Sequence, residues 1–224
     1  MRILSVLMVS SFVATSAVAQ DADRSVAGGG ITVSGWKGRV DRRPLSQGKT
    51  IADSKLASEA GALRLSIGPA AFYWNDANTA SGDYQVKATF KEHKMAAGHP
   101  HSYGIFIGGS GLASDTERLA YCIVYGNGTY SVKTFAGAKV TSVVDRATHD
   151  ALHKADANGE ATNEIGWKVQ GGKAACVVNG VEVKSFDQAE LVGPEKLTSL
   201  DGIYGIRVSH NLELTVSGLA KSKP

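Results

Sequence analysis

The chain has 224 residues and a formal net charge of only +3, which argues against nucleic acid as a partner. Phosphate backbones are bound by clustered Lys and Arg, and no run of like charges here exceeds a few residues. No segment beyond the N-terminus approaches the ~20 apolar residues of a transmembrane helix. We therefore expect no nucleic-acid partner and no transmembrane segment, while the oligomeric state stays open.

Residues 1–19 have the features of a secretory signal peptide. Arg2 supplies a positive charge, an apolar run follows over residues 3–13, and Ala17-Val18-Ala19 matches the small-residue pattern before a cleavage site. We expect cleavage near Ala19 and a periplasmic or extracellular location for the remaining chain. Its length suits a single β-sandwich domain.

Short alternating runs broken by Gly, Asn and Asp predict an all-β domain. The alternation is cleanest at Tyr84–Lys91, whereas residues 102–107 are apolar on both faces and indicate a central strand. Turn sequences at Gly126–Thr129 and Asn179-Gly180 predict hairpins. The predicted parts are an N-terminal strand and extended connection (20–60), a main body of the same domain (61–219) and a tail (220–224).

About a dozen such strands bury two sheet faces best as an antiparallel two-sheet sandwich. One insertion departs from the pattern and predicts a short helix near 146–155. The two cysteines, Cys122 and Cys176, lie in apolar strands. A simple meander would hold them roughly 14 Å apart at ~4.8 Å per strand, which favours free buried thiols. Facing sheets would permit a disulfide, so both states stay open.

The second half of the chain carries a recognisable order of strands. Its segments are GDYQVKATF, YGIFIGG, the hairpin YCIVYGNGTYSVKTF, the pair IGWKVQGGKAACVVNGVEV and finally GIYGIRV. This order resembles the concanavalin A-like lectin and glucanase jelly rolls, nearest to exported bacterial 3-keto-disaccharide hydrolase-like domains, over roughly residues 61–219. The resemblance implies a jelly-roll sandwich with Trp167 in its core and an association with sugars.

Catalytic motifs are weak. Glucanases of this superfamily use a strand with E-x-D-x-x-E, and retaining cleavage needs two carboxyl groups about 5–5.5 Å apart. The nearest candidates, Asp115 and Glu117, lie in a polar loop, and no G-x-S-x-G nucleophile motif is present. We therefore expect no classical glycosidase chemistry, and the sequence leans against an enzyme.

Histidines at two places have partial metal-ligand spacing. His149 and His153 are separated by four residues, as in a helical zinc site, but without a third ligand nearby. His99 and His101 flank Pro100 in a loop before a strand. Both sets are incomplete, so exposed histidines are the expectation, no cofactor is predicted, and Ca²⁺ stays open.

An aromatic and amide cluster suits sugar recognition, because sugar rings present apolar CH faces and many hydroxyl groups. Tyr73, Trp74 and Asn75 come at an expected strand end, with Asn78 opening the next loop. The ordinary alternative is that these aromatic residues are core and the amides are turn residues. The candidate carbohydrate-binding residues are Tyr73, Trp74, Asn75, Asn78, Tyr103, Arg207 and His210.

We interpret the sequence as an exported carbohydrate-associated β-sandwich whose partner is a glycan or polysaccharide. One alternative is a hydrolase acting on a modified (3-keto) disaccharide. Another is an adhesion or structural module of the cell envelope.

Overall fold

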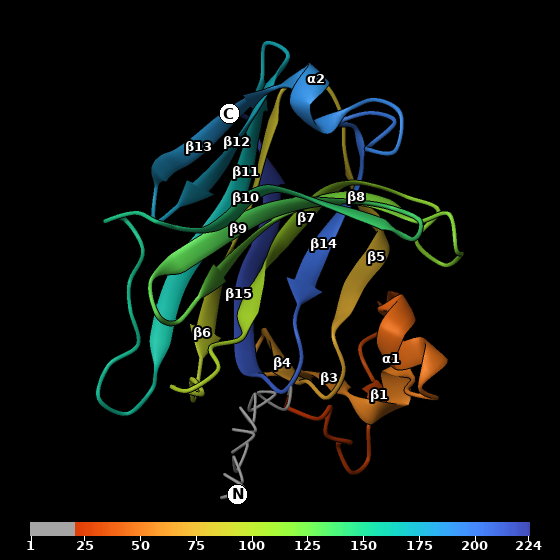
Figure 1. Cartoon of the computed structure of the whole chain (residues 1–224), viewed down its shortest axis with the longest axis vertical. Coiled ribbons are helices and arrows are strands. Elements are labelled where there is room, and N and C mark those ends of the chain that lie inside the picture. Colours follow the sequence, from red (N-terminus) through yellow and green to blue (C-terminus); the bar gives the residue numbers. More distant parts are fainter. Residues whose placement is uncertain (1–20) are drawn as a thin grey trace, which may run out of the picture.

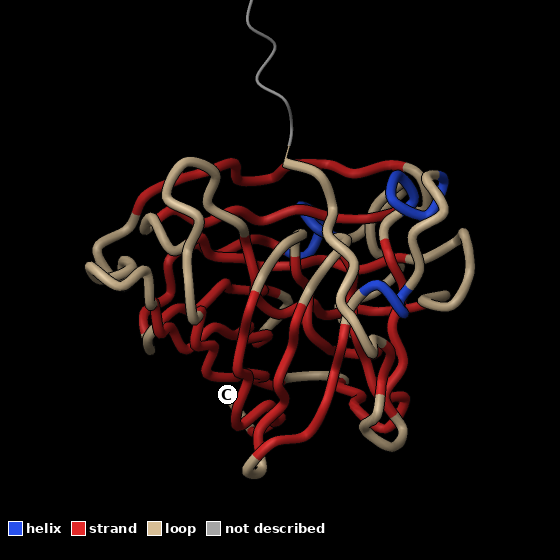
Figure 2. Tube along the Cα trace, turned by 90° about the horizontal axis from the view of Figure 1, so that it is seen from below, coloured by secondary structure: helices blue, strands red, loops and turns tan. Residues whose placement is uncertain are grey.

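The computed structural model describes residues 21–224, so the expected signal peptide lies outside the described residues. Strands make up most of this part of the chain and form two sheets, which we call the larger and the smaller sheet (Figures 1 and 2). All strand pairs of residues 21–224 are antiparallel except the short parallel pair β1–β3. The predicted two-sheet jelly-roll sandwich is confirmed.

Strand order explains how distant parts of the sequence meet. The larger sheet runs β1 (Gly30–Ile31), β3 (Lys55–Glu59), β4 (Ala62–Ser66), β15 (Glu213–Ser222), β6 (Tyr84–Glu92), β11 (Ala161–Gln170), β12 (Lys173–Val178) and β13 (Val181–Asp187). The smaller sheet runs β10 (Lys139–Thr148), β9 (Thr129–Ala136), β8 (Arg118–Tyr125), β7 (Ser102–Ser110), β14 (Gly202–Val208), β5 (Ala71–Ala80) and β2 (Trp36–Val40).

The inner core lies between the sheets and follows the two-residue period of each strand. Trp167 on β11 is completely buried, and its Nε1 donates a hydrogen bond of 3.0 Å to the carbonyl of Ile105 on β7. This bond joins the two sheets through the centre of the core. Asn179 and Gly180 both have positive φ, 50° and 80°, which is the geometry of the tight hairpin turn that the sequence predicts.

The cysteines form a disulfide, and the expectation of free thiols is wrong. Cys122 on β8 and Cys176 on β12 belong to different sheets, with a Cα–Cα distance of 5.9 Å. The expected separation of the two cysteines assumed that both lie in one meandering sheet, with the intervening strands between them. Because the chain crosses to the facing sheet instead, both side chains point into the same interlayer space.

Helices are short and lie at the ends of the sandwich. Within residues 21–224 they are α1 (Arg42–Ser46), the 3₁₀ helix η1 (Ile51–Asp53) and α2 (Gln188–Leu191), and Figure 1 shows α1 and α2 at opposite ends. The helix expected near 146–155 does not form. β10 continues to Thr148 and a turn follows, because the segment pairs with β9 rather than winding on itself.

Candidate functional site

The outer face of the smaller sheet carries a second apolar layer. On β5, Tyr73 points into the inner core, whereas Phe72 and Trp74 point outward. Phe72 contacts Trp74 and Phe106, with ring centroids 5.7 and 6.2 Å apart. We call this set the outer layer; its buried members are Phe72, Trp74, Phe106, Leu112, Leu119, Tyr121, Ile123 and Tyr125.

Arg207 on β14 covers part of the outer layer. Its guanidinium lies 5.3 Å from the ring centre of Tyr121 and 5.2 Å from that of Phe135. Both terminal nitrogens donate to the carboxylate of Asp41, at 2.6 and 2.5 Å. Its side chain is only 8% exposed. Arg207 therefore stabilises the layer as a bidentate ion pair stacked on aromatic rings, and these bonds already occupy the terminal nitrogens predicted to bind sugar.

A second group of ion pairs borders the same face. Arg39 on β2 contacts both Asp115 and Glu117, and Arg42 on α1 donates to Glu117 at 3.2 Å. The Glu117 side chain is 5% exposed, while that of Asp115 is 75% exposed. The two carboxylates thus anchor arginines of the N-terminal segment across the sheet edge. This is a structural role and offers no free acid–base pair.

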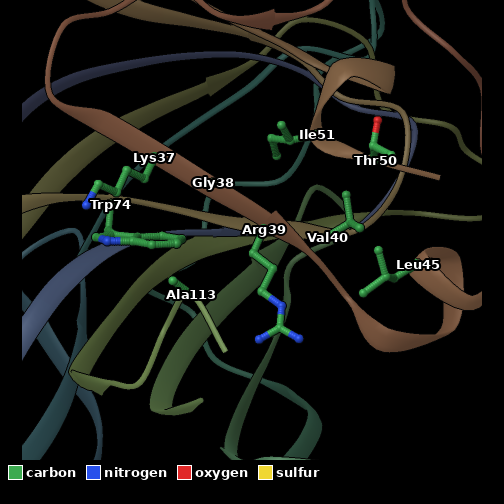
Figure 3. A pocket seen from close by; sticks show the side chains of 9 residues that line it. All are labelled: Lys37, Gly38, Arg39, Val40, Leu45, Thr50, Ile51, Trp74 and Ala113. Atoms are coloured by element: carbon green, nitrogen blue, oxygen red, sulfur yellow. The ribbon is translucent and has the colours of Figure 1, made fainter. Parts of the chain in front are cut away.

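A groove runs past Trp74 at the β2–β5 edge of this face. One hollow, of about 480 Å³, has Trp74 beside Lys37, Arg39 and Ala113, with apolar residues of the segment after β2 on its far side (Figure 3). A second, of about 320 Å³, is lined by Trp74 together with Lys37, Asp76 and Ala113. Since both hollows share Trp74, Lys37 and Ala113, we treat them as one site and call it the Trp74 groove.

Register explains why these residues meet. Lys37 pairs with Trp74 on the neighbouring strand, so both side chains project from the outer face. Trp74 Nε1 donates to Asp76 Oδ1 at 2.9 Å, and Lys37 Nζ donates to Asp76 Oδ2 at 2.6 Å. The hydrogen bond from Lys37, followed by that from Trp74, lowers the pKa of Asp76. The groove therefore combines an aromatic floor with a charged, hydrogen-bonding rim.

The other sequence candidates are not gathered at this groove. Tyr73 and Tyr103 are completely buried in the inner core, so neither contacts a ligand on the surface of this conformation. β5 does not end after the aromatic run but continues to Ala80, which places Asn75 and Asn78 within the strand. Asn75 uses its side-chain oxygen to accept from the backbone of Ala77.

His210 lies at a different corner, together with His99 and His101. The ligand nitrogens of these three histidines lie within 4.8 Å of one another. Burial, together with the neighbouring His210 and His99, lowers the pKa of His101 to about 4, so its ring is neutral at pH 7. His149 and His153 lie in the turn after β10, where their Nδ1 atoms contact backbone groups of Ala151 and Thr162. The sequence pairs His99 with His101 but gives no sign of His210 as the third member.

The fold is shared with solved structures at low sequence identity. The carbohydrate-binding module CBM66 from Bacillus subtilis aligns with a TM-score of 0.57 and 9% identity over 86% of this chain and 98% of its own. A Bacillus subtilis protein of unknown function with a galectin-like fold aligns at 0.56 and 12% identity, over 84% and 89%. The alginate lyase A1-II′ aligns at 0.52 and 15% identity, over 85% and 95%.

The topology and these neighbours define the class of the protein as a two-sheet jelly-roll sandwich. No protein-family model and no curated protein sequence matches the chain. Identities of 9–15% establish the fold alone, so function has to be argued from the Trp74 groove.

Proposed function

We propose that this protein is an exported glycan-binding module whose ligand lies in the Trp74 groove. The observation that carries the proposal is the placement of Trp74 on the floor of a hollow whose rim is formed by the Lys37–Asp76 ion pair. Trp74 itself is 4% exposed, so a ligand in the hollow can contact only a small part of this residue.

The chemistry of the groove matches that of a sugar. An aromatic ring packs well against the CH face of a pyranose or furanose, and the ring hydroxyls need both donors and acceptors around them. Lys37 donates, Asp76 accepts, and both side chains are more than half exposed. A sugar hydroxyl can therefore insert between them and accept from one while donating to the other.

The fold supports the same proposal. A neighbour of similar length is a carbohydrate-binding module by name, and another is an enzyme named for alginate. By these names, the same type of sandwich is associated with carbohydrates in those proteins. What the scaffold binds in this chain depends on its own Trp74, Lys37 and Asp76.

Two observations support an extracytoplasmic location. The N-terminal sequence up to Ala19 has the signal-peptide pattern. The Cys122–Cys176 disulfide is a bond that persists in oxidising compartments. Among residues 21–224, no helix has the length and apolar character needed to cross a membrane.

A glycan array followed by titration calorimetry tests the proposal, with alginate and a neutral β-glucan as soluble probes. We expect Trp74→Ala and Lys37→Met to weaken binding at least tenfold. Lys173→Met is the matched control, because Lys173 also forms an exposed 2.6 Å ion pair, with Asp187, but on the larger sheet. Circular dichroism checks that each variant is folded.

The binding experiment, an assay for 3-keto-disaccharide turnover and a pull-down from envelope extract together separate the alternatives. Absence of binding to every glycan, or equal binding by wild type and the two groove variants, overturns the proposal. Turnover of a 3-keto disaccharide would instead favour the hydrolase that the sequence resemblance suggests. Retention of an envelope protein without any glycan binding would favour an adhesion or structural module.

A further inference from the structure

Three histidines from two loops converge at the corner where the N-terminal segment meets the sandwich. His99 and His101 precede β7, and His210 lies in the connection from β14 to β15. Their rings pack edge to face, with centroid distances of 5.1 Å for His99–His101, 6.0 Å for His99–His210 and 4.4 Å for His101–His210. The three rings are therefore mutual neighbours, although His210 is more than a hundred positions away in sequence.

The packing of the three rings leaves His101 Nε2 without a hydrogen-bond partner in the described part of the chain. His101 is 3% exposed, and among the described residues its Nε2 makes no hydrogen bond. A buried nitrogen without a partner costs free energy, and a bound ion is one of the ways in which a native protein satisfies such an atom. The nearest carboxylate oxygen, Asp21 Oδ2, lies 3.8 Å from it. At this distance the contact is too long for a hydrogen bond.

The second histidine has the hydrogen-bond partner that metal-bound histidines use. His210 Nδ1 lies 2.8 Å from Asp23 Oδ1. When Nδ1 donates to this carboxylate, Nε2 is left with a free lone pair and the ring orientation is fixed. Carboxylate–histidine pairs of this kind are typical of metal-binding histidines.

The surrounding backbone holds the corner in place. Ser102 N donates to Ser209 Oγ at 2.8 Å, and Ser209 N donates to Ser102 O at 2.8 Å, which joins the two histidine loops. Asn211 Nδ2 donates to Asp21 Oδ2 at 3.0 Å and to the carbonyl of Ala22 at 2.9 Å. The first two bonds hold the histidine loops together, and the two from Asn211 hold the N-terminal segment with Asp21 beside them.

We propose that His99, His101 and His210 bind a divalent transition-metal ion of the zinc class, with Asp21 as the adjacent carboxylate and Asp23 orienting His210. Nitrogen ligands at 2.0–2.1 Å in a tetrahedral site are about 3.3 Å apart. The nitrogens, within 4.8 Å of one another, reach that spacing through small side-chain rotations. Imidazole nitrogens suit Zn²⁺ and Cu²⁺ rather than Ca²⁺ or Mg²⁺.

An ion can reach this corner from solvent. A hollow of about 560 Å³ is lined by Asp21, Asp23, Ser209 and His210. His99 is exposed, so its side chain is free to complete the site as the ion arrives. The proposed site does not depend on glycan binding, and its residues differ from those of the Trp74 groove.

Zn²⁺ titration of the mature protein, residues 20–224 without a polyhistidine tag and freed of metal with a chelator, tests the proposal. We expect one Zn²⁺ per chain, and at least about 100-fold weaker binding in His99→Gln and His210→Gln. Asp23→Asn should weaken binding about 10–100-fold through the orientation of His210. His149→Gln and His153→Gln are the matched controls and should bind as wild type does.

Thermal unfolding supplies an independent readout, because an ion that binds only the folded state raises the melting temperature. Excess Zn²⁺ should stabilise wild type but not His99→Gln, whose exposed side chain is not needed for folding. Lack of saturable binding by wild type, unchanged binding in His99→Gln, or loss of binding in His149→Gln would each overturn the site. The titration contains no glycan, so its failure leaves the Trp74 groove untouched.

Discussion

The two faces of the smaller sheet are both buried, but they are buried in different ways. The inner face packs against the larger sheet through side chains such as Tyr73, Ile105 and Ile206. The outer face has Phe72, Trp74 and Phe106 covered by arginine–carboxylate pairs from the N-terminal segment and by the loop that carries Leu112. The inner face is closed by another sheet, whereas the outer face is closed by arginine–carboxylate pairs and a loop, with the Trp74 groove at its edge.

This difference shows where binding residues are found in such a sandwich. Trp74 and its neighbour Tyr73 differ by one position and are similar in chemistry, yet only Trp74 lines a hollow. Its position in the strand decides the face, and the covering elements decide whether that face is accessible. Substitutions on the two faces should therefore separate stability from binding.

The largest effect is expected from Trp167→Ala, because Trp167 projects from the larger sheet and packs against the inner face of the smaller one. This variant removes a fully buried ring and its hydrogen bond to Ile105, so unfolding free energy should fall by about 3–5 kcal/mol. Urea denaturation followed by tyrosine fluorescence or circular dichroism measures the loss. A loss below about 1 kcal/mol would mean that the centre of the core lies elsewhere.

Glu92, on β6 of the larger sheet near Tyr103 of the inner face, makes the stability of the core depend on pH. Both carboxylate oxygens are buried without a hydrogen bond among the described residues. Burial raises the pKa of Glu92 to about 7, against the lowering effect of the nearby Tyr103 hydroxyl. Between its ordinary value of 4.5 and about 7, the folded state holds a proton that the unfolded state has lost, so this contribution to stability falls as pH rises.

Glu92→Gln should remove that dependence, because the amide stays neutral at every pH. At pH 8 the variant should be more stable than wild type by up to roughly 3 kcal/mol, and at pH 4.5 the two should be similar. Melting curves across this pH range measure the difference. A constant offset between the two proteins would show that Glu92 does not titrate near pH 7 in the folded state.

On the outer face, Arg207→Met should cost roughly 2 kcal/mol, because Asp41 is left half-buried without its partner. Adding Asp41→Asn should recover part of the loss. A double-mutant cycle measured by urea denaturation should give a coupling of about 1–3 kcal/mol. Additive single effects would mean that the ion pair does not hold the N-terminal segment on this face.

The smallest effect on stability is expected from Lys37→Met at the groove rim. Exposed ion pairs contribute about 0–1 kcal/mol, and Lys37 and Asp76 are both more than half exposed. The melting temperature should barely change, whereas glycan binding should fall as described above. A large loss of stability would place Lys37 among the structural residues and weaken the distinction between the two faces.

Local pattern predicts much of the fold in this chain. Alternation along β6 and β11 places Trp167 in the core, and Asn179-Gly180 specifies its turn through positive φ. Pairing across the sandwich is not local, so the sequence gives no sign that Cys122 faces Cys176. For the same reason the sequence does not predict His210 as a neighbour of His101. The two histidines meet because β14 pairs with β7.

The residue type and position of Trp74 predict it as a ligand-binding residue, whereas nothing in the sequence predicts Lys37. Lys37 joins the site only because the register of β2 against β5 places it beside Trp74. The expected strand end at Asn75 is wrong because turn-forming residues can also extend an exposed strand when a partner is available. Here β14 pairs with β5 as far as Ala80.

The disulfide between the sheets also bears on when the sandwich acquires its final stability. Closing a loop of 54 residues limits the unfolded chain and is worth roughly 4 kcal/mol in the chain-entropy account. Under the export proposed above, the precursor in a reducing cytosol would lack that contribution and would be easier to keep unfolded for passage through a secretion channel. Oxidation after translocation would then link the layers, and recombinant material made in a reducing host should be reoxidised before its affinity is measured.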